Sequence, residues 1–491
     1  MIQNASLVVT EAVPAGTNLS FPNLHSSCGS NYQVVSADIC RVGLNVTTSA
    51  TSQIYMESWL PRNWTGRFLS TGNGGLGGCI KYNDLAYTSY LGFAAVGANN
   101  GHDGNTGEPF EDKPEVLADF AYRSIHTNVV VGKEITQLFY GFPHQKSYYF
   151  GCSTGGRQGL KSVQDFPEDF DGVVAGAPAA NFNALLSWSG HFFGITGSSS
   201  SPSFISSDLW QSLIHENVIS QCDGVDGVLD GIIEDPNLCE YDPSQLLCSE
   251  GQTSDCLTEE QVETVRAVYS PFLGSEGNVI YPSAQLGSES EGLRLYSGTP
   301  FAYASDWFRY VVYNASFDPT TLTLADYEHA LALDPFNIAT WKGDISAFQR
   351  RNGKLLSYHG QSDGLISPKI TESYYERVSK SMGLPSSSLD DFYRLFMISG
   401  MGHCRGGVGA WDIGQGTSPT MADLDPGSNV LTAVVRWVEE GIAPETIMGY
   451  KYVNDTPALG VAFTRRHCRY PLKNTYDGSG DGSNPDSWEC Q

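Results

Sequence analysis

The sequence predicts an α/β fold in which a parallel sheet has helices on both faces. Two observations support this prediction. Short apolar runs that resemble buried strands alternate with segments of helical spacing from residue 67 to about residue 180. The buried-strand pattern then returns at KLLSYHG (354–360). Because strand–helix–strand alternation is typical of a doubly wound parallel sheet, we expect one such domain with a long insertion.

The first elements are expected between residues 67 and 179. RFLSTGNGGLGG (67–78) and LGFAAVGANNG (91–101) each read as a strand that runs into a glycine-rich loop. Apolar residues at helical spacing over 114–141 predict one or two helices. A strand, a helix that ends at Pro167 and a further buried strand are then expected at KSYYF (146–150), RQGLKSVQDFP (157–167) and FDGVVAGAPA (170–179).

The character of the chain changes near residue 180, where serine-rich and cysteine-containing segments replace the alternating pattern. We read the residues from there to the next strand as an insertion into the α/β domain. The predicted organisation is a first part of the α/β domain at 1–179, the insertion at 180–338 and the second part of the α/β domain at 339–491. The loop-like tail is expected to be tied down through Cys490.

The composition excludes several classes of partner. The chain has 491 residues, 41% of them hydrophobic, which is enough for a large core. Its 54 acidic and 28 basic residues give a net charge of −26, which argues against a nucleic acid or an anionic membrane as partner. No apolar run reaches the length of roughly 18 residues that a membrane-spanning helix needs, so no span is expected.

The cysteines and glycosylation sequons predict a secreted, extracellular protein. The first residues lack the features of a signal peptide, so the chain either never entered the secretory pathway or is a mature form with an added Met. The 11 cysteines and six sequons favour the second interpretation. The sequons begin at Asn4, Asn18, Asn45, Asn63, Asn314 and Asn454.

GCSTGGRQG (151–159) matches the G-x-S-x-G pattern of a nucleophile elbow, with Ser153 at its centre. The turn is strained and needs small neighbours, which the surrounding glycines supply. The helix expected after it would point its N-terminal N–H groups at the site. The alternative is that Ser153 lies in a structural turn, but the preceding strand and following helix favour a nucleophile.

A serine nucleophile also needs an acid and a base, which in an α/β-hydrolase follow the serine in the order Asp or Glu, then His. Asp363 comes directly after the strand at 354–360, where the acid is expected. His403 lies on a loop in SGMGHCRGG (399–407) and is the favoured base. His102, on a glycine-rich loop, is its main rival. His359, within the strand, is a weaker candidate, whereas His126 and His215 fall in helical patterns and are expected to be surface or core residues.

A cysteine precedes the expected nucleophile and another follows the expected base. A Cys152–Cys404 disulfide would join the two loops that must meet for catalysis, and it would close a loop of about 250 residues. The alternatives are that Cys152 is a second nucleophile or that the two residues are unrelated buried thiols. We favour the disulfide because an elbow exposes only its central residue.

An oxyanion hole requires two backbone N–H donors. Thr154, the residue after the expected nucleophile, should supply one of them. The glycine-rich loop GNGGLGG (72–78) allows a close backbone approach, and Gly75 is the expected second donor. The alternative is a plain tight loop that is pinned by Cys79.

Together, GCSTGGRQG, Asp363 and GHC (402–404) resemble the tannase/feruloyl esterase family, whose members share a CS-D-HC motif with a disulfide beside the triad. The resemblance extends over nearly the whole chain. It implies an α/β-hydrolase fold with a large inserted lid domain. It also implies that Ser153 is the nucleophile, Asp363 orients the imidazole and His403 is the general base and acid.

The loop CDGVDGVLDGIIEDPNLC (222–239) carries three aspartates with glycines between them, which by themselves fit either a cation site or a solvated acidic turn. The loop also resembles the calcium site of the family's lid, where backbone carbonyls complete the set of ligands. The resemblance therefore implies one structural Ca²⁺, bound by Asp223, Asp226, Val228, Asp230 and Ile232.

With the family in view, the remaining cysteines are expected to pair, apart from one. The expected pairs are Cys28–Cys79, Cys222–Cys239, Cys248–Cys256 and Cys468–Cys490. Cys40 is then expected to be free, unless it competes for Cys79.

The resemblance implies a serine carboxylic-ester hydrolase that acts through an acyl-enzyme. CDGVDGVLDGII and CLTEEQV look like the lids of fungal feruloyl esterases, so hydroxycinnamic acid esters of plant cell walls are the expected substrates. Galloyl esters, the substrates of a tannase, are the closer alternative. A non-catalytic, calcium-stabilised binding protein on the same fold is the more distant one. Aromatic residues in FAYASDWFRYVVY (301–313) are expected mostly to pack in the core of the insertion.

Overall fold

The computed structural model describes residues 2–415 and 424–491. Its largest sheet has nine strands in the order β1-β4-β5-β7-β6-β8-β9-β12-β13. These strands are β1 (Ala5–Val13), β4 (Ile39–Thr47), β5 (Gln53–Pro61), β6 (Arg67–Thr71), β7 (Ala94–Ala98), β8 (Lys146–Cys152), β9 (Gly172–Gly176), β12 (Lys354–Gly360) and β13 (Tyr393–Ile398).

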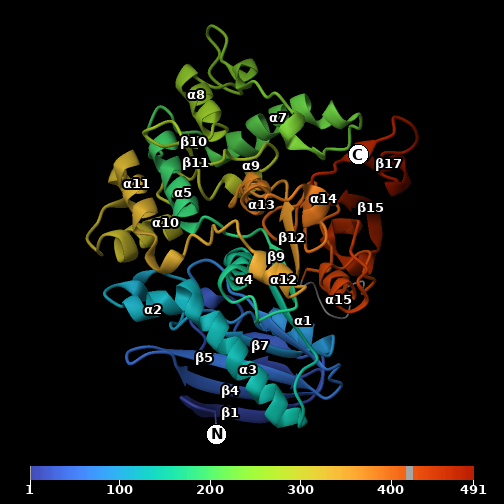
Figure 1. Ribbon diagram of the computed structural model, residues 1–491. Helices are drawn as coiled ribbons and strands as arrows, with labels where there is room; N and C mark the ends of the chain where they lie inside the picture. Colours follow the sequence, from blue (N-terminus) through green and yellow to red (C-terminus); the bar gives the residue numbers. More distant parts are fainter. Residues whose placement is uncertain (1, 416–423) are drawn as a thin grey trace.

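Six of these strands, from β7 to β13 across the sheet, are parallel, as the alternating pattern predicts. The other three are antiparallel, so the sheet is mixed and not wholly parallel. The reason is local, because β4 and β5 are joined by the short turn at residues 48–52, which reverses the chain. Figure 1 shows these N-terminal strands in blue at one end of the molecule.

Helices cover both faces of the sheet. On one face lie α3 (Ser124–Tyr140), α4 (Thr154–Asp165) and α13 (Lys369–Met382), whereas α1 (Tyr82–Tyr90) and α15 (Val430–Glu440) lie on the other. Alternate strand residues serve the two cores, since Tyr149 packs with the first group and Tyr148 with the second. Helix α2 (Pro114–Ala118) and the π-helical turn η3 (Asp119–Arg123) precede α3 without a break, so 114–141 is one helical segment.

Residues 180–338 lie between β9 and β12, which are neighbours in the sheet. This insertion is mainly helical and is coloured green to yellow in Figure 1. Its α-helices are α5 (Phe182–Thr196), α6 (Ser207–Leu209), α7 (His215–Cys222), α8 (Glu259–Val268), α9 (Glu289–Gly292), α10 (Ala302–Trp307) and α11 (Leu324–Leu333). Its only described strands, β10 (Phe272–Leu273) and β11 (Val279–Tyr281), form a hairpin.

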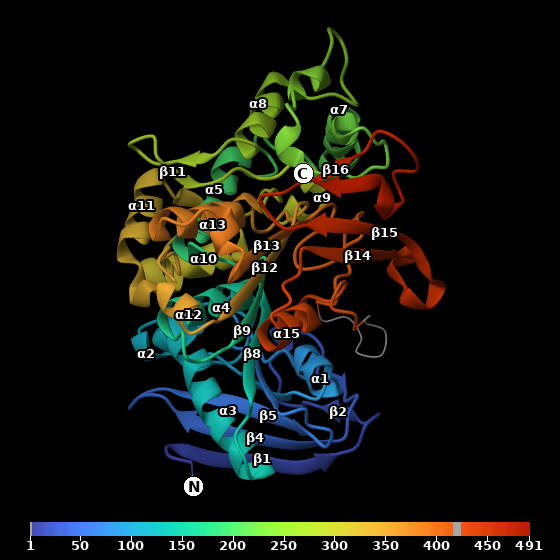
Figure 2. The same ribbon diagram turned by 45° about the vertical axis from the view of Figure 1, so that its right-hand side comes forward.

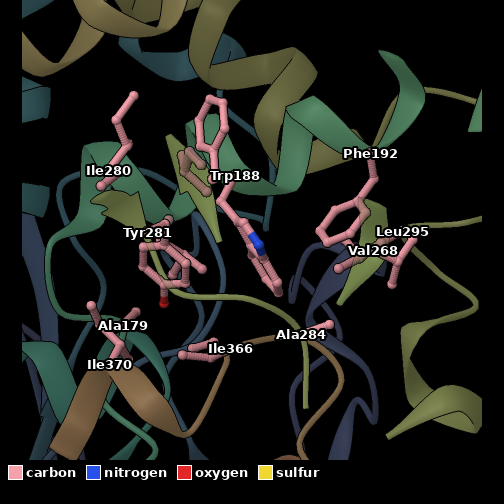
Figure 3. Close-up of a cluster of buried hydrophobic side chains, with 14 of the residues drawn as sticks. Ala179, Trp188, Phe192, Val268, Ile280, Tyr281, Ala284, Leu295, Ile366 and Ile370 are labelled. Atoms are coloured by element: carbon pink, nitrogen blue, oxygen red, sulfur yellow. The ribbon is translucent and has the colours of Figure 1, made fainter. Parts of the chain in front are cut away.

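The insertion and the sheet domain share a hydrophobic core. Trp188 and Phe192 of α5 pack with Tyr281 and other residues of the insertion, and Ile366 and Ile370 of the sheet domain belong to the same cluster (Figure 3). Each large apolar side chain buried in this shared cluster contributes about 1.5–3 kcal/mol. The insertion is therefore packed firmly against the sheet domain.

The C-terminal segment forms two small hairpins, β14 (Thr446–Tyr452) with β15 (Val461–Cys468) and β16 (Asn474–Tyr476) with β17 (Trp488–Cys490). Figure 2 shows this segment in red beside α7 of the insertion. Arg465 of β15 bridges to Asp230 and Glu234 of the insertion, each at 2.7 Å. Two short helices, α12 (Ser346–Arg350) and α14 (Ser386–Leu389), and the hairpin of β2 (Asn18–Ser20) with β3 (Tyr32–Val34) complete the larger elements. None of the described helices is long and apolar enough to cross a membrane.

Candidate active site

Ser153 lies at a sharp turn between β8 and α4. Its backbone has φ 66° and ψ −125°, a left-handed conformation that a side chain adopts only under strain. The turn is fixed by the backbone N–H of Ser153, which donates to Gly176, and by its carbonyl, which accepts from Ala179. A Cβ at Gly156 would lie 2.3 Å from the carbonyl oxygen of Gly176, so the turn needs a glycine there. The local geometry is that of the predicted elbow.

The expected base and acid contact each other. Nδ1 of His403 donates to Oδ2 of Asp363 at 2.8 Å, which leaves Nε2 of His403 available for a proton from another group. His403 is 19% exposed, and it lines the same pocket as Ser153. The tertiary structure thus brings together three residues that are up to 250 positions apart in the sequence.

Asp363 is fully buried and satisfied on both carboxylate oxygens. Oδ1 accepts from the backbone N–H groups of Leu365 (2.8 Å) and Ile366 (2.9 Å). Oδ2, which accepts from His403, also accepts a hydrogen bond from a second imidazole, since Nε2 of His359 lies 3.0 Å from it. Both neighbours of this nitrogen are acceptors, so it carries the proton, and Nδ1 of His359 accepts from the hydroxyl of Thr371. His359 therefore supports Asp363 and is not the base.

The pKa of Asp363 is lowered and that of His403 is raised. Burial alone would raise the pKa of Asp363, but the charge of His403 and the hydrogen bonds from His359 and His403 hold it below its ordinary value. Burial alone would lower the pKa of His403, but the charge of Asp363 and their hydrogen bond raise it above its ordinary value. The arrangement favours an imidazolium beside a carboxylate, which is the state needed after proton transfer from a serine.

The disulfide predicted beside these residues is confirmed. Cys152 and Cys404 are bonded, with a Cα–Cα distance of 6.1 Å and a sequence separation of 252. It joins the end of β8 to the residue after His403. The other four predicted bonds are also present, and Cys40 is free as expected.

The glycine-rich loop at 72–78 packs against the start of α4. The hydroxyl of Thr154 donates to the carbonyl of Gly75 at 2.7 Å, and Gly75 has φ 58°. Both residues line the pocket beside Ser153. The rival base, His102, is buried, and its Nε2 lies 2.8 Å from the carbonyl of Leu76, so it fixes this loop and does not face the nucleophile.

The pocket beside Ser153 has about 440 Å³ of empty volume, including the part open to solvent. Few of the residues that line this pocket were predicted from the sequence. Four of the lining residues come from α5 at positions i, i+3, i+4 and i+7, and the first three of these are apolar, so the sequence does show this helical repeat. The lining residues are Gly75, Leu76, Ser153, Thr154, Ala179, Phe182, Leu185, Leu186, Ser189, Phe301, Tyr303, Leu365, Ile366 and His403.

Of the aromatic residues expected to pack in the core of the insertion, Trp307 and Phe308 do so. Phe301 and Tyr303 are partly buried against the same core and also line the pocket. His126 and His215 lie elsewhere and pair with Asp169 and Glu289, as expected for residues outside the site.

The aspartates of the 222–239 loop mainly cap their own loop. Asp223, Asp226 and Asp230 each accept a backbone N–H through Oδ1. Oδ2 of Asp226 is buried without a close hydrogen bond, and the charge of Asp230 contributes, after burial, to raising the pKa of Asp226. This donor chemistry fits a hard cation. However, the described residues hold no group of three or more His, Cys, Asp or Glu side chains that could bind a metal, so calcium stays a prediction.

Comparison with known proteins agrees with this geometry. The family model for tannase and feruloyl esterase matches residues 38–491. The chain belongs to this family. A probable feruloyl esterase B-2 of Aspergillus oryzae is 54% identical over 492 residues, which cover 100% of this chain and 93% of that protein. A protein of the same description from Aspergillus fumigatus is also 54% identical, with the same coverage.

Solved structures of the tannase and feruloyl esterase family have the same fold. Feruloyl esterase B from Aspergillus oryzae superposes with a TM-score of 0.97 at 51% identity, covering 100% of this chain and 97% of that one. Tannin acyl hydrolase from Aspergillus niger superposes with a TM-score of 0.76 at 21% identity, covering 100% and 92%. The chain therefore has the α/β-hydrolase fold that its motifs predict.

Proposed function

We propose that the protein is a serine carboxylic-ester hydrolase that releases hydroxycinnamic acids, such as ferulic acid, from plant cell-wall or related esters. The observation that carries this proposal is the apolar pocket that Ser153 and His403 line together. The names of the relatives at 54% identity over the whole chain support the same substrate class.

In the proposed reaction, Ser153 attacks the ester carbonyl while Nε2 of His403 takes its proton. Asp363, held by two backbone N–H groups and by His359, keeps the His403 ring in place and stabilises its charged form. His403 then protonates the leaving alcohol. A water molecule, activated by the same nitrogen, hydrolyses the acyl-enzyme and releases the acid.

Backbone donors near Thr154 and Gly75 would hold the oxyanion of the tetrahedral intermediate. Support for this role comes from the position of both residues in the pocket and from the hydrogen bond between them. Gln158 of α4 accepts from the backbone N–H of Asn73 at 2.9 Å, so the glycine-rich loop is fixed to the helix that follows the nucleophile. Such preorganisation lets the donors act without rearrangement during the reaction.

The lining of the pocket favours a hydroxycinnamoyl group over a galloyl group. Among the described residues, and apart from those assigned to catalysis and the oxyanion, only Ser189 and Tyr303 offer polar side-chain atoms to the pocket. The hydroxyl of Ser189 already donates to Leu185. A galloyl ring buries three hydroxyl groups, and each would lose free energy if it were buried without a partner. A feruloyl ring carries one hydroxyl and one less polar methoxy group.

We therefore expect methyl ferulate to be hydrolysed with a kcat/KM at least about tenfold above that for methyl gallate, because unpartnered hydroxyl groups weaken transition-state binding. The measurement is kcat/KM for methyl ferulate, p-coumarate, caffeate, sinapate and gallate under one set of conditions. A preference for gallate would favour a tannase. Absence of turnover with all five esters would favour a binding protein.

We further propose that the 222–239 loop binds one structural Ca²⁺, through the carboxylates of Asp223, Asp226 and Asp230 and the carbonyls of Val228 and Ile232. The buried second oxygen of Asp226 supports this proposal. The loop is closed by the Cys222–Cys239 bond, and the buried Arg465 forms an ion pair with Asp230 at 2.7 Å. The ion would stabilise this part of the insertion and take no part in ester hydrolysis.

Chelation should therefore lower the melting temperature by several degrees while kcat/KM at 25 °C stays within twofold, because a ligand that binds only the folded state stabilises it. The measurement is a thermal melt with EDTA and again after Ca²⁺ is restored. An Asp226→Asn variant is the matched control, and its melt should respond much less to EDTA. An unchanged melt of the wild type on chelation would disprove the calcium site.

Secretion and glycosylation also remain proposals for this chain. Five disulfides among the described residues are consistent with an oxidising compartment. Five of the six sequon asparagines are exposed and could carry a glycan, whereas Asn45 is half-buried in the central part of β4.

A further inference from the structure

A single carboxylate of the insertion contacts both loops that carry the acid and the base. Oε2 of Glu291, in α9, accepts the backbone N–H of His403 at 2.8 Å and that of Gly364 at 3.2 Å. Gly364 directly follows Asp363. Glu291 is 112 residues from His403 and 73 residues from Gly364, so only the docked insertion brings it there.

Two glycines make room for this contact. A Cβ on Gly402 would lie 2.4 Å from Oε1 and 2.8 Å from Cδ of Glu291. A Cβ on Gly364 would lie 2.4 Å from the backbone nitrogen of Gly292, also in α9. Real Cβ atoms do not approach other atoms this closely, so a side chain on Gly402 would displace the carboxylate of Glu291, and one on Gly364 would push the backbone of α9 away. The two loops and α9 are thus packed backbone to backbone around one carboxylate.

The charge of Glu291 acts on His403 as well. Three charged groups face the imidazole: Asp363 and Glu291 raise its pKa, whereas Arg294 lowers it. Burial and the charge of Asp363 raise the pKa of Glu291, and the N–H groups of Gly364 and His403 oppose this by stabilising the charged form. A second negative group near His403 favours the imidazolium that forms during catalysis.

We propose that Glu291 is a positioning residue for the proposed esterase reaction. Through two backbone hydrogen bonds and its charge, it holds the His403 and Asp363 loops in register, so the triad is complete only when the insertion is docked. The proposal rests on the assignment of Ser153, His403 and Asp363 as the catalytic residues. Glu291 does not touch the ester, and it acts through His403 and Asp363.

The first test is Glu291→Gln, which keeps one acceptor oxygen but removes the charge. We expect kcat for methyl ferulate to fall by about tenfold, as for other groups that orient a catalytic residue, with KM within about twofold. The acid limb of the pH profile of kcat/KM should move to lower pH, because His403 loses an attracting charge. Glu276→Gln, at an exposed carboxylate in the β10–β11 turn of the insertion, is the control and should change neither quantity.

The second test is Gly402→Ala, which displaces the carboxylate without removing it. We expect this change to lower kcat by about tenfold in the wild type and by less than twofold in a Glu291→Ala background, where the space is free. Equal losses in the two backgrounds would overturn the proposal. A Glu291→Gln variant with a lower melting temperature but an unaltered kcat and pH profile would also overturn it, because the residue would then be only structural. Ser153→Ala, assayed in parallel, shows separately whether the triad itself is assigned correctly.

Discussion

Replacement of Ser153 by alanine is expected to lower kcat/KM for methyl ferulate by about 10⁴-fold or more, because no acyl-enzyme can form without the hydroxyl. The fold should survive, since the hydroxyl makes no hydrogen bond that caps α4, and alanine is the smallest side chain that keeps the backbone close to its present conformation. The measurement combines steady-state kinetics with a thermal melt of both proteins.

The matched control for this experiment is Ser162→Ala, in the same helix. The hydroxyl of Ser162 donates only to the carbonyl of Gln158, one turn earlier, and Ser162 does not line the pocket. Its kcat/KM should remain close to that of the wild type. If Ser153→Ala retained wild-type activity, the nucleophile would have to be another residue, and the proposed mechanism would be wrong.

Removal of the Cys152–Cys404 bond, by replacing both residues with alanine, is expected to lower both stability and activity. The bond spans 252 residues, and the entropic model assigns such a loop a stabilisation of up to about 5 kcal/mol. The bond also fixes the residue before Ser153 to the residue after His403. If Ser153 and His403 are held less firmly, kcat should fall by at least about tenfold, since catalytic groups must be held to within a fraction of an ångström.

The bond between Cys248 and Cys256 provides the control for the size of the effect and for its link to catalysis. The sequence separation of these two cysteines is only 8, and for such a loop the same model gives a stabilisation of about 2–3 kcal/mol. Neither cysteine lines the pocket. We expect its removal to lower the melting temperature modestly and to leave kcat unchanged. If the Cys152/Cys404 variant showed wild-type kcat and melting temperature, that bond would be incidental to function.

Several features of the site could be read from the sequence because each has a local signature. The elbow is a run of nine residues with glycines around Ser153, and Asp363 follows a recognisable buried strand. Cys152 and Cys404 marked the nucleophile and base loops as neighbours, and the structure confirms their bond. The parallel strands β6, β7, β8, β9 and β12 were also predicted, since each is a short apolar run, whereas β13 was not.

Other features had no local signature. The antiparallel pairing of β1, β4 and β5 depends on a turn that resembles any other polar loop, so the sheet was expected to be wholly parallel. The pocket stripe on α5 was visible as a helical repeat, but the same repeat is typical of ordinary core packing. His359 is the strand residue that was expected, but nothing in the local pattern showed that it would be the second imidazole to donate to Asp363.

The candidate catalytic groups of this protein were predictable from the amino-acid sequence: a serine in a strained turn, an acid and a histidine in α/β-hydrolase order, and the cysteines that join two of their loops. These assignments depend on residue type and on short spacings, which the chain specifies directly. The residues that surround these groups are defined only by the tertiary structure. Glu291 and the pocket face of α5 reach the site only because the insertion packs against the sheet domain, whereas His359 reaches Asp363 from β12 of the sheet domain itself. Contacts between residues about 100 positions apart arise from packing of whole elements, and no local pattern records which of many similar side chains will meet.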